Sequence, residues 1–259
     1  MPRNKNIDWK NYDGPDQVMS SHELEMKLKE TQPSILNLRS RIPSLDRAID
    51  GFRDGELIVI SGPTKNGKTL FAQTLTVNFC RQQEYPLWFS FELPPKQFLS
   101  QFSPLPLFYV PEKLKAHVFD WVEDKVQEGF AKFRTRVIFI DHLHYLFDMA
   151  RTKNPSIEIG TVIRRLKNIA VVNNFVIFLL CHTIKGKNED NLSYESIRDS
   201  SFISQESDCV LMIKRTPKTR ENAAQLSIEF HRRTGVMGKM VDLWKINSLL
   251  QEIANEEKK

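Results

Sequence analysis

Short apolar runs alternate with longer amphipathic segments through the middle of the chain, and this alternation predicts its architecture. Four near-continuous apolar runs are typical of strands buried on both faces of a parallel sheet. They are Leu57–Ile60, Leu87–Phe89 with Phe91, Val137–Ile140 and Val176–Leu180. Between them, apolar residues recur at spacings of one, three and four over 118–133 and 159–170, which predicts two helices. Strands that alternate with helices indicate a doubly wound α/β domain with right-handed crossovers.

The two ends of the chain depart from this pattern. The amino-terminal stretch is polar and predicts an arm, followed by a short helix with Ser21 as a candidate N-cap and Glu30 near its end. Later, successive apolar runs with little between them predict a partly antiparallel edge of the sheet. These runs are Cys209–Ile213, Gln225–Phe230 and Met240–Trp244. We expect an arm with a possible linker helix over 1–40, a core domain over 41–246 and a tail over 247–259.

Composition and charge narrow the class of protein only a little. Apolar residues make up 41% and charged residues 27%, as in ordinary soluble globular proteins, and the net charge of +5 permits a polyanionic partner. The three cysteines, Cys80, Cys181 and Cys209, are far apart, which favours reduced thiols in a cytoplasmic protein. The amino terminus lacks an apolar signal segment, and no apolar run is long enough to cross a bilayer. We expect a cytoplasmic protein without a membrane partner.

A P-loop pattern, G-x-x-x-x-G-K-[ST], lies between the first predicted strand and the helical segment that follows it. This order suits phosphate binding, because glycines let backbone N–H groups converge and the helix N-terminus adds partial positive charge. Lys68 is expected to reach the β- and γ-phosphates, and the Thr69 hydroxyl to bind Mg²⁺. A solvated Gly/Lys turn is the alternative. We expect ATP and Mg²⁺ as cofactors, with these residues at the nucleotide: Gly62, Pro63, Thr64, Lys65, Asn66, Gly67, Lys68, Thr69 and Leu70.

Polar residues after three other predicted strands supply the remaining parts of such a site. Asp141 ends a buried strand, where an unpaired carboxylate is costly, so we expect it to hold Mg²⁺ directly or through water. Glu92 lies at the carboxyl end of its strand, where ligands of open α/β sheets bind, and is the candidate to orient or deprotonate water. His182 is a candidate sensor of the γ-phosphate. The alternatives are a solvated glutamate and a structural histidine.

Five segments in order carry a more specific signal. They are Ile42–Arg47 with the glycines that follow it, Phe89–Pro94, Ile140–Leu146, Ser196–Asp208 and His231–Gly238. Together they resemble the RecA-like ATPase domain of DnaB-type replicative DNA helicases over about residues 41 to 245, with KaiC-type ATPases and RecA as more distant relatives. The resemblance implies a RecA-like P-loop NTPase fold: a doubly wound, mostly parallel central sheet with added C-terminal strands.

The resemblance also implies an assembly. DnaB-type helicases form rings, commonly hexameric, with ATP bound between neighbouring subunits. Arg233 would then be an arginine finger that reaches the γ-phosphate bound to the adjacent subunit. His231 stands where these helicases usually carry a lysine. By composition alone, the same residues are a basic cluster after a strand.

Two loops are candidates to grip nucleic acid, as the corresponding loops of the family do. Residues 149–155 carry Arg151 and Lys153, and residues 183–192 carry Lys185 and Lys187. Basic loops of this kind suit contact with the backbone of single-stranded DNA without sequence preference. They contain no aromatic side chain for base stacking. Glu189 and Asp190 also weaken the positive charge of the second loop, for which a solvated loop is the alternative.

The leading hypothesis is therefore an ATP-driven, ring-forming DNA helicase or single-stranded DNA translocase that acts in replication, with a possible replication partner protein. About 40 residues precede the core, so we expect a standalone motor core of the phage or plasmid kind, in which the helix near Ser21 docks on the neighbouring subunit. Two alternatives stay open. One is a KaiC-like regulatory ATPase that switches a protein partner, and the other is a RecA-like recombination ATPase.

Overall fold

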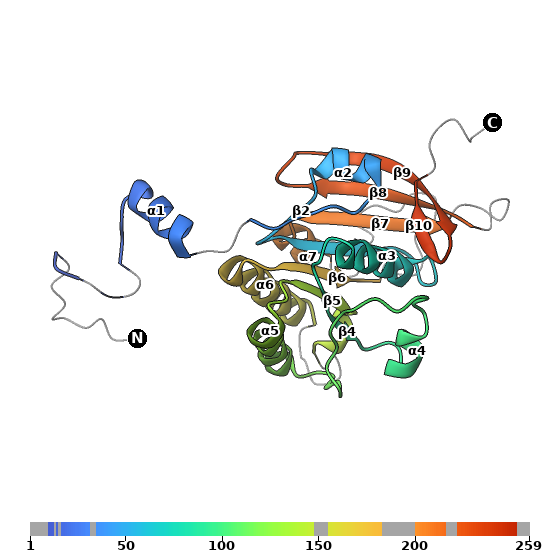
Figure 1. Cartoon of the computed structure of the whole chain (residues 1–259), viewed down its shortest axis with the longest axis horizontal. Coiled ribbons are helices and arrows are strands. Elements are labelled where there is room, and N and C mark those ends of the chain that lie inside the picture. Colours follow the sequence, from blue (N-terminus) through green and yellow to red (C-terminus); the bar gives the residue numbers. More distant parts are fainter. Residues whose placement is uncertain are drawn as a thin grey trace. The chain divides into compact units, whose positions relative to one another are not determined.

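The computed structural model describes residues 10–12, 14, 17–31, 35–147, 155–182, 200–215 and 222–252 (Figure 1). The chain divides into two units, Met1–Ile35 and Leu36–Lys259. The second unit contains the sheet and the residues expected at the nucleotide.

The first unit contains helix α1, Ser21–Thr31. Its N-cap is Ser20, not Ser21. The Ser20 Oγ accepts the N–H of Glu23 at 3.2 Å, and the Glu23 carboxylate accepts the N–H of Ser20 at 2.8 Å. This reciprocal pair is a capping box, which depends on a glutamate three residues after the cap and therefore selects the first of the two serines. Three apolar side chains of α1 are exposed: Leu24, Met26 and Leu28.

An eight-stranded sheet forms the centre of the second unit, in the order β10-β9-β8-β7-β3-β6-β5-β4. Its strands are β3 (Leu57–Ser61), β4 (Leu87–Ser90), β5 (Val137–Asp141), β6 (Val176–Leu180), β7 (Cys209–Arg215), β8 (Ala223–His231), β9 (Met237–Ile246) and β10 (Leu249–Gln251). The strands from β4 to β7 pair in parallel, whereas β8, β9 and β10 pair antiparallel. The predicted α/β fold with a mostly parallel sheet and added C-terminal strands is confirmed.

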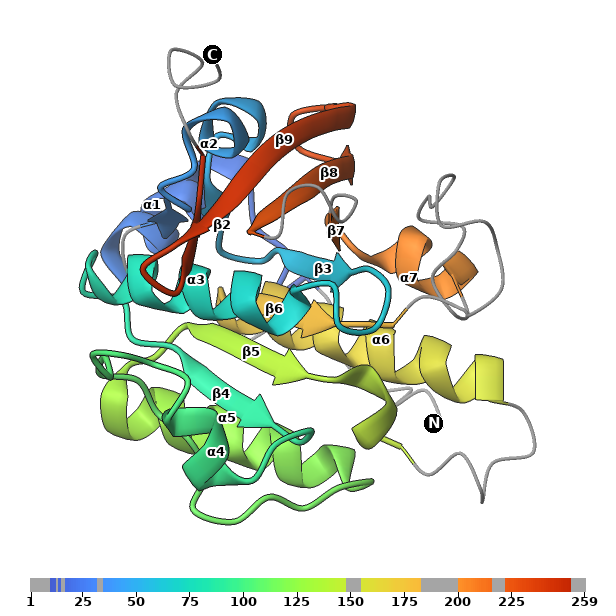
Figure 2. The same ribbon diagram turned by 90° about the vertical axis from the view of Figure 1, so that its right-hand side faces the viewer.

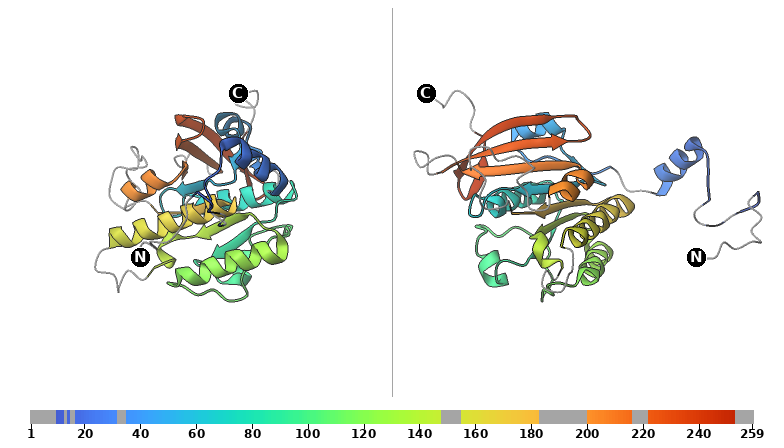
Figure 3. Two further views of the ribbon diagram at one scale, coloured as in Figure 1. Left: turned by 90° about the vertical axis from the view of Figure 1, so that its left-hand side faces the viewer. Right: turned by 180° about the vertical axis from the view of Figure 1, so that it is seen from behind.

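Helices cover both faces of the parallel strands (Figures 2 and 3). The helices of this unit are α2 (Pro43–Ile49), α3 (Lys68–Cys80), α4 (Pro95–Leu99), α5 (Phe119–Phe133), α6 (Pro155–Asn173) and α7 (Ser200–Glu206). A 3₁₀ turn, η1 (Leu143–Tyr145), follows β5. Strands β1 (Asn37–Leu38) and β2 (Phe52–Arg53) form a small separate sheet. Alternate residues of β3 enter two cores: Ile58 and Ile60 pack with α2 and α3, and Leu57 and Val59 pack with α5 and α6. Burial of β3 on both faces explains why its sequence is a continuous apolar run.

Strand β10 lies within the range that the sequence assigns to a tail. It pairs with β9, and the Leu250 N–H donates to the Thr74 Oγ1 of α3 at 3.0 Å. Two short polar residues, Asn247 and Ser248, form the turn between the strands with positive φ angles. A three-residue strand carries too weak a periodic signal to stand out in the sequence. Among the described helices, none has the length and apolar character that crossing a membrane requires.

Candidate nucleotide-hydrolysis site

The P-loop joins the end of β3 to the start of α3, and its glycines are needed for that turn. Gly62 has a φ of +146°, and a Cβ added there would lie 2.1 Å from the carbonyl oxygen of Ile213 on β7. Gly67, at φ +98°, is the N-cap of α3. The Asn66 Oδ1 accepts the N–H of Arg215 at 2.8 Å, which fastens the loop to β7. The backbone therefore has the conformation that lets N–H groups converge on an anion at a helix N-terminus.

Lys68 is the first residue of α3, and its side chain folds back into the loop. Its Nζ donates to the carbonyl oxygens of Gly62 at 2.8 Å and Pro63 at 2.9 Å, and the residue is only 6% exposed. Burial lowers the pKa of this amine, and the nearby carboxylates of Glu92 and Asp141 oppose that effect without cancelling it. The Lys68 ammonium group is thus a buried cation without full charge compensation, next to the backbone of the P-loop.

Thr69 and Asp141 meet at the same place. The Thr69 Oγ1 donates to the Asp141 Oδ2 at 2.9 Å, from the first turn of α3 to the last residue of β5. Asp141 is 3% exposed, and burial, with a further contribution from Glu92, raises its pKa to about 6. A hydroxyl and a carboxylate are the oxygen ligands that Mg²⁺ prefers beside a phosphate. The donor set fits Mg²⁺ and nucleotide, and a bound cation would also compensate the buried carboxylate.

Glu92 lies beside this pair, between the end of β4 and the start of α4. Its Oε1 is 2.8 Å from the Nε2 of His182 and 3.0 Å from the Nε2 of His142. Hydrogen bonds from His142 and His182 hold the pKa of Glu92 well below its usual range, although burial opposes them. The three side chains offer donor atoms within 4.8 Å of one another, a group that could hold a metal ion.

Arg233 lies at the opposite end of β3. Its Nε donates to Glu56 Oε1 at 2.9 Å, and its Nη2 donates to the carbonyl oxygens of Ile49 and Gly51. Glu56 precedes β3, whereas the P-loop follows it, so five strand residues, about 16 Å, separate Arg233 from its own phosphate loop. Arg233 is therefore outside the nucleotide site of its own chain.

His231 is turned inward. Its side chain is fully buried, with the Nδ1 2.8 Å from the Thr234 hydroxyl and the Nε2 3.5 Å from the Glu56 carboxylate. Burial raises the pKa of Glu56, but contacts from His231, the Arg53 N–H and Arg233 outweigh it and the pKa is lowered. In this conformation His231 cannot replace an exposed lysine that reaches another subunit.

A comparison with protein families identifies the chain. A sequence model of the DnaB-like helicase C terminal domain matches residues 98–248, more than half of the 259 residues. The chain belongs to this family. A model of the KaiC ATPase matches residues 38–107, the part that holds the P-loop.

Relatives of this DnaB-family chain are replicative helicases by name. It is 26% identical over 246 residues to a probable replicative DNA helicase of Trieres chinensis, covering 79% of this chain and 54% of the relative. It is 21% identical over 233 residues to the replicative DNA helicase DnaB of Rickettsia typhi, covering 73% of this chain and 47% of the relative. The chain spans about half the length of the curated relatives it matches.

Solved structures share the fold. One of them, an ATPase domain, matches with a TM-score of 0.75 at 16% identity, over 90% of this chain and 97% of that one. A DnaB-like replicative helicase, solved with its interactions with primase, matches with a TM-score of 0.74 at 17% identity, over 93% of this chain and 69% of that one. The RecA-like ATPase fold expected of a DnaB-family chain is thus shown.

The structure brings together the predicted Lys68, Thr69, Asp141, Glu92 and His182 and adds His142 to them. His142 follows Asp141 directly, but nothing in the sequence shows that its ring faces Glu92, 50 residues earlier. The candidate DNA contacts of this DnaB-family chain, Arg151, Lys153, Lys185 and Lys187, lie outside the described residues.

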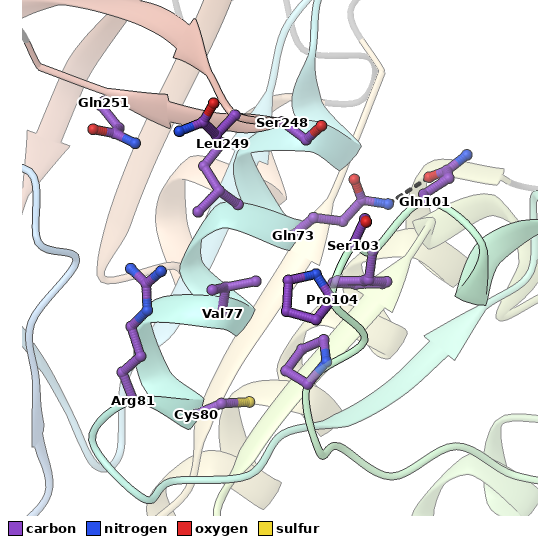
Figure 4. A pocket seen from close by; sticks show the side chains of 13 residues that line it. Gln73, Val77, Cys80, Arg81, Gln101, Ser103, Pro104, Ser248, Leu249 and Gln251 are labelled. Carbon is purple, nitrogen blue, oxygen red and sulfur yellow. Dashed lines mark hydrogen bonds between the residues drawn. The ribbon is translucent and has the colours of Figure 1, made fainter.

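Two pockets border α3. One is lined by α3, the loop 101–106 and the turn at Ser248, with side chains such as Gln73, Val77 and Arg81 pointing into it (Figure 4). None of its lining residues belongs to the P-loop, so it is distinct from the phosphate site of this DnaB-family chain. A smaller pocket adjoins the P-loop at Leu70 and is lined further by Arg215, Asn222, Ala224, Lys245 and Leu250. The sequence did not predict these lining residues, because they come from four different C-terminal strands or their loops.

Proposed function

We propose that this protein is an ATP-hydrolysing, ring-forming DNA helicase or single-stranded DNA translocase of the DnaB type that acts in DNA replication. The observation that carries the proposal is the Thr69–Asp141 contact beside Lys68 and Glu92, in a chain of the DnaB-like family. It supports hydrolysis of a nucleotide at the carboxyl edge of the sheet, where open α/β sheets bind ligands.

Each side chain has a role in this proposal. Residues 62–70 hold the phosphates, Lys68 neutralises the β- and γ-phosphates, and Thr69 and Asp141 hold Mg²⁺, which supplies charge neutralisation when bound. Glu92 orients the attacking water with its ionised carboxylate, and His182, in contact with Glu92, senses the γ-phosphate. The small pocket beside Leu70 has the position to take the nucleoside.

A ring completes the site. Arg233 is about one strand length from its own P-loop, so a contact between Arg233 and a γ-phosphate requires a second subunit. We assign Arg233 as the arginine finger of the neighbouring subunit in a homohexamer, with α1 as a linker helix that docks on that neighbour. The four basic residues of the two loops, Arg151, Lys153, Lys185 and Lys187, would grip single-stranded DNA. A replication partner, such as the primase named for one structural relative, and a cytoplasmic location belong to the proposal.

Hydrolysis of ATP with and without single-stranded DNA tests it. We expect stimulation by DNA, and losses of at least about 100-fold in Lys68→Ala and Arg233→Ala. Arg232→Ala is the matched control, because Arg232 bonds the carbonyl of Gln205 and not Glu56. Mixing the two inactive variants is the sharpest arm. The Arg233→Ala chain supplies an intact Lys68, and the Lys68→Ala chain supplies an intact Arg233. If the site is shared between subunits, mixed rings therefore regain hydrolysis, whereas a site formed within one chain stays inactive.

The KaiC match over residues 38–107 favours a second candidate, a regulatory ATPase whose nucleotide state switches a protein partner. That function predicts slow hydrolysis that DNA does not change. Rates that are equal with and without DNA, together with nucleotide-dependent capture of a purified replication protein, would support it over the helicase.

A further inference from the structure

Glu92 is not held by regular secondary structure. Strand β4 ends at Ser90 and α4 begins at Pro95, so Glu92 lies on the short connection between them. Its side chain is 33% exposed. A glutamate with three rotatable side-chain bonds at such a position needs contacts from elsewhere to stay in one orientation. The structure supplies two, both to Oε1.

One of these contacts comes from His142, whose ring is fixed at both nitrogens. The Nδ1 accepts the backbone N–H of His144 at 3.3 Å and so caps the turn η1. In a neutral imidazole, an accepting Nδ1 requires the proton to be on Nε2. The Nε2 therefore donates to Glu92 Oε1 at 3.0 Å, from a side chain that is 12% exposed.

Contacts between aromatic rings also fix the orientation of the His142 ring beside Glu92. The His142 ring lies 4.4 Å from the His182 ring in an edge-to-face geometry and 5.0 Å from the Tyr145 ring. Tyr145 in turn stacks on Phe91 at 5.7 Å, and Phe91 is the residue before Glu92. Strand β5 with its following turn thus supports both the backbone and the carboxylate at Glu92.

We propose that His142 is a positioning residue for hydrolysis: its Nε2–H fixes Oε1 of Glu92, together with His182, so that Oε2 faces the attacking water. This assignment rests on the proposed ATPase function. It differs from the metal site that the same three side chains could form, because a metal at Nε2 would require the proton on Nδ1, which here accepts a hydrogen bond.

Two amide substitutions of His142 test the roles of its two ring nitrogens one at a time. The amide of His142→Asn reaches the position of Nδ1 and can keep the cap, but it is too short for Glu92. The amide of His142→Gln reaches the position of Nε2 and can keep the N–H donor. We expect the Asn variant to lose about tenfold in kcat with the KM for ATP within about twofold, and the Gln variant to stay within about threefold of wild type. His117→Gln is the matched control, at a histidine whose Nδ1 lies 2.7 Å from the Phe147 carbonyl oxygen.

The outcomes are distinct. Equal rates in the Asn and Gln variants, with melting temperatures near that of wild type, would overturn the positioning role. A cobalt(II) absorption band in the visible range that either variant abolishes would assign the cluster to a metal and overturn it as well. The comparison uses basal hydrolysis, so it can be made even if DNA fails to stimulate the wild-type enzyme, a result that would remove the helicase and leave this inference standing.

Discussion

Buried charges lie beyond both ends of β3, and they are compensated in opposite ways. At the amino end, Glu56 contacts Arg233 and His231, and its pKa is lowered. At the carboxyl end, Asp141 has a threonine hydroxyl for a partner and a raised pKa, and Lys68 donates to backbone carbonyls with a lowered pKa. One end is compensated within the chain, whereas the other is not.

The difference in charge compensation distinguishes residues that stabilise the fold from residues that are placed to bind a ligand. Buried charges without adequate partners cost folding free energy, so a fold keeps them where a ligand compensates them. A phosphate and a cation would do so at the carboxyl end. The amino end has its partners already, because Glu56 and the carbonyls of Ile49 and Gly51 hold the Arg233 guanidinium in place. Four substitutions test this contrast.

The largest effect is expected from Asp141→Asn. Loss of the carboxylate removes the proposed Mg²⁺ ligand, so kcat for ATP should fall by about 1,000-fold, or about 4 kcal/mol of barrier. The free energy of unfolding without nucleotide should not fall, because a poorly compensated buried charge is removed. Steady-state hydrolysis and urea unfolding measure the two quantities, with the exposed Asp124→Asn as control. A clear loss of stability would show that Asp141 is structural.

Next is Gly62→Ala, which should destabilise the protein by about 3 kcal/mol, because the added Cβ meets the Ile213 carbonyl at 2.1 Å and φ is +146°. Gly235→Ala is the matched substitution at the other end of β3. Its φ is +71°, and no atom lies within 4 Å of the added Cβ, so the cost should be about 1 kcal/mol. Urea unfolding gives both values, and equal costs would contradict the close approach of the P-loop to β7.

Glu56→Gln should cost about 2 kcal/mol of stability, because Arg233 and His231 lose the charge they face in a buried position. The shape of the side chain is kept, so the loss reports charge compensation. Urea midpoints at pH 7.5 measure it. A neutral result, with Asp141→Asn also neutral, would remove the contrast between the two ends of the strand.

The smallest effect concerns pH. The pKa of Asp141 is about 6 in the folded chain against an ordinary 3.8, so the folded state binds this proton more tightly and stability falls as pH rises from about 4 to 6. Asp141→Asn removes that dependence. The difference in free energy of unfolding between Asp141→Asn and wild type should therefore favour the variant more at pH 7.5 than at pH 5. We expect a change of roughly 1 kcal/mol, because water that reaches the carboxylate reduces the desolvation penalty. Urea titrations without Mg²⁺ at the two pH values test the sign.

Local signals account for what the sequence predicted well. The P-loop is contiguous, and each of Asp141, Glu92 and His182 ends or follows an apolar run that is long enough to be recognised as a strand. Parallel strands end at the same edge, so residues after them converge without any knowledge of side-chain contacts. The same reasoning predicted the C-terminal strands, apart from the three residues of β10.

The sequence by itself therefore determined the class of fold, the P-loop turn and which strand ends carry the candidate site residues. Tertiary structure alone decided that His142 turns to Glu92, that Arg233 packs on Glu56 from 177 residues away and that His231 is buried. These outcomes depend on the orientation of single side chains across distant segments. Periodicity and motif spacing constrain the backbone path, but side-chain partners are selected by burial and hydrogen bonding once the chain has folded.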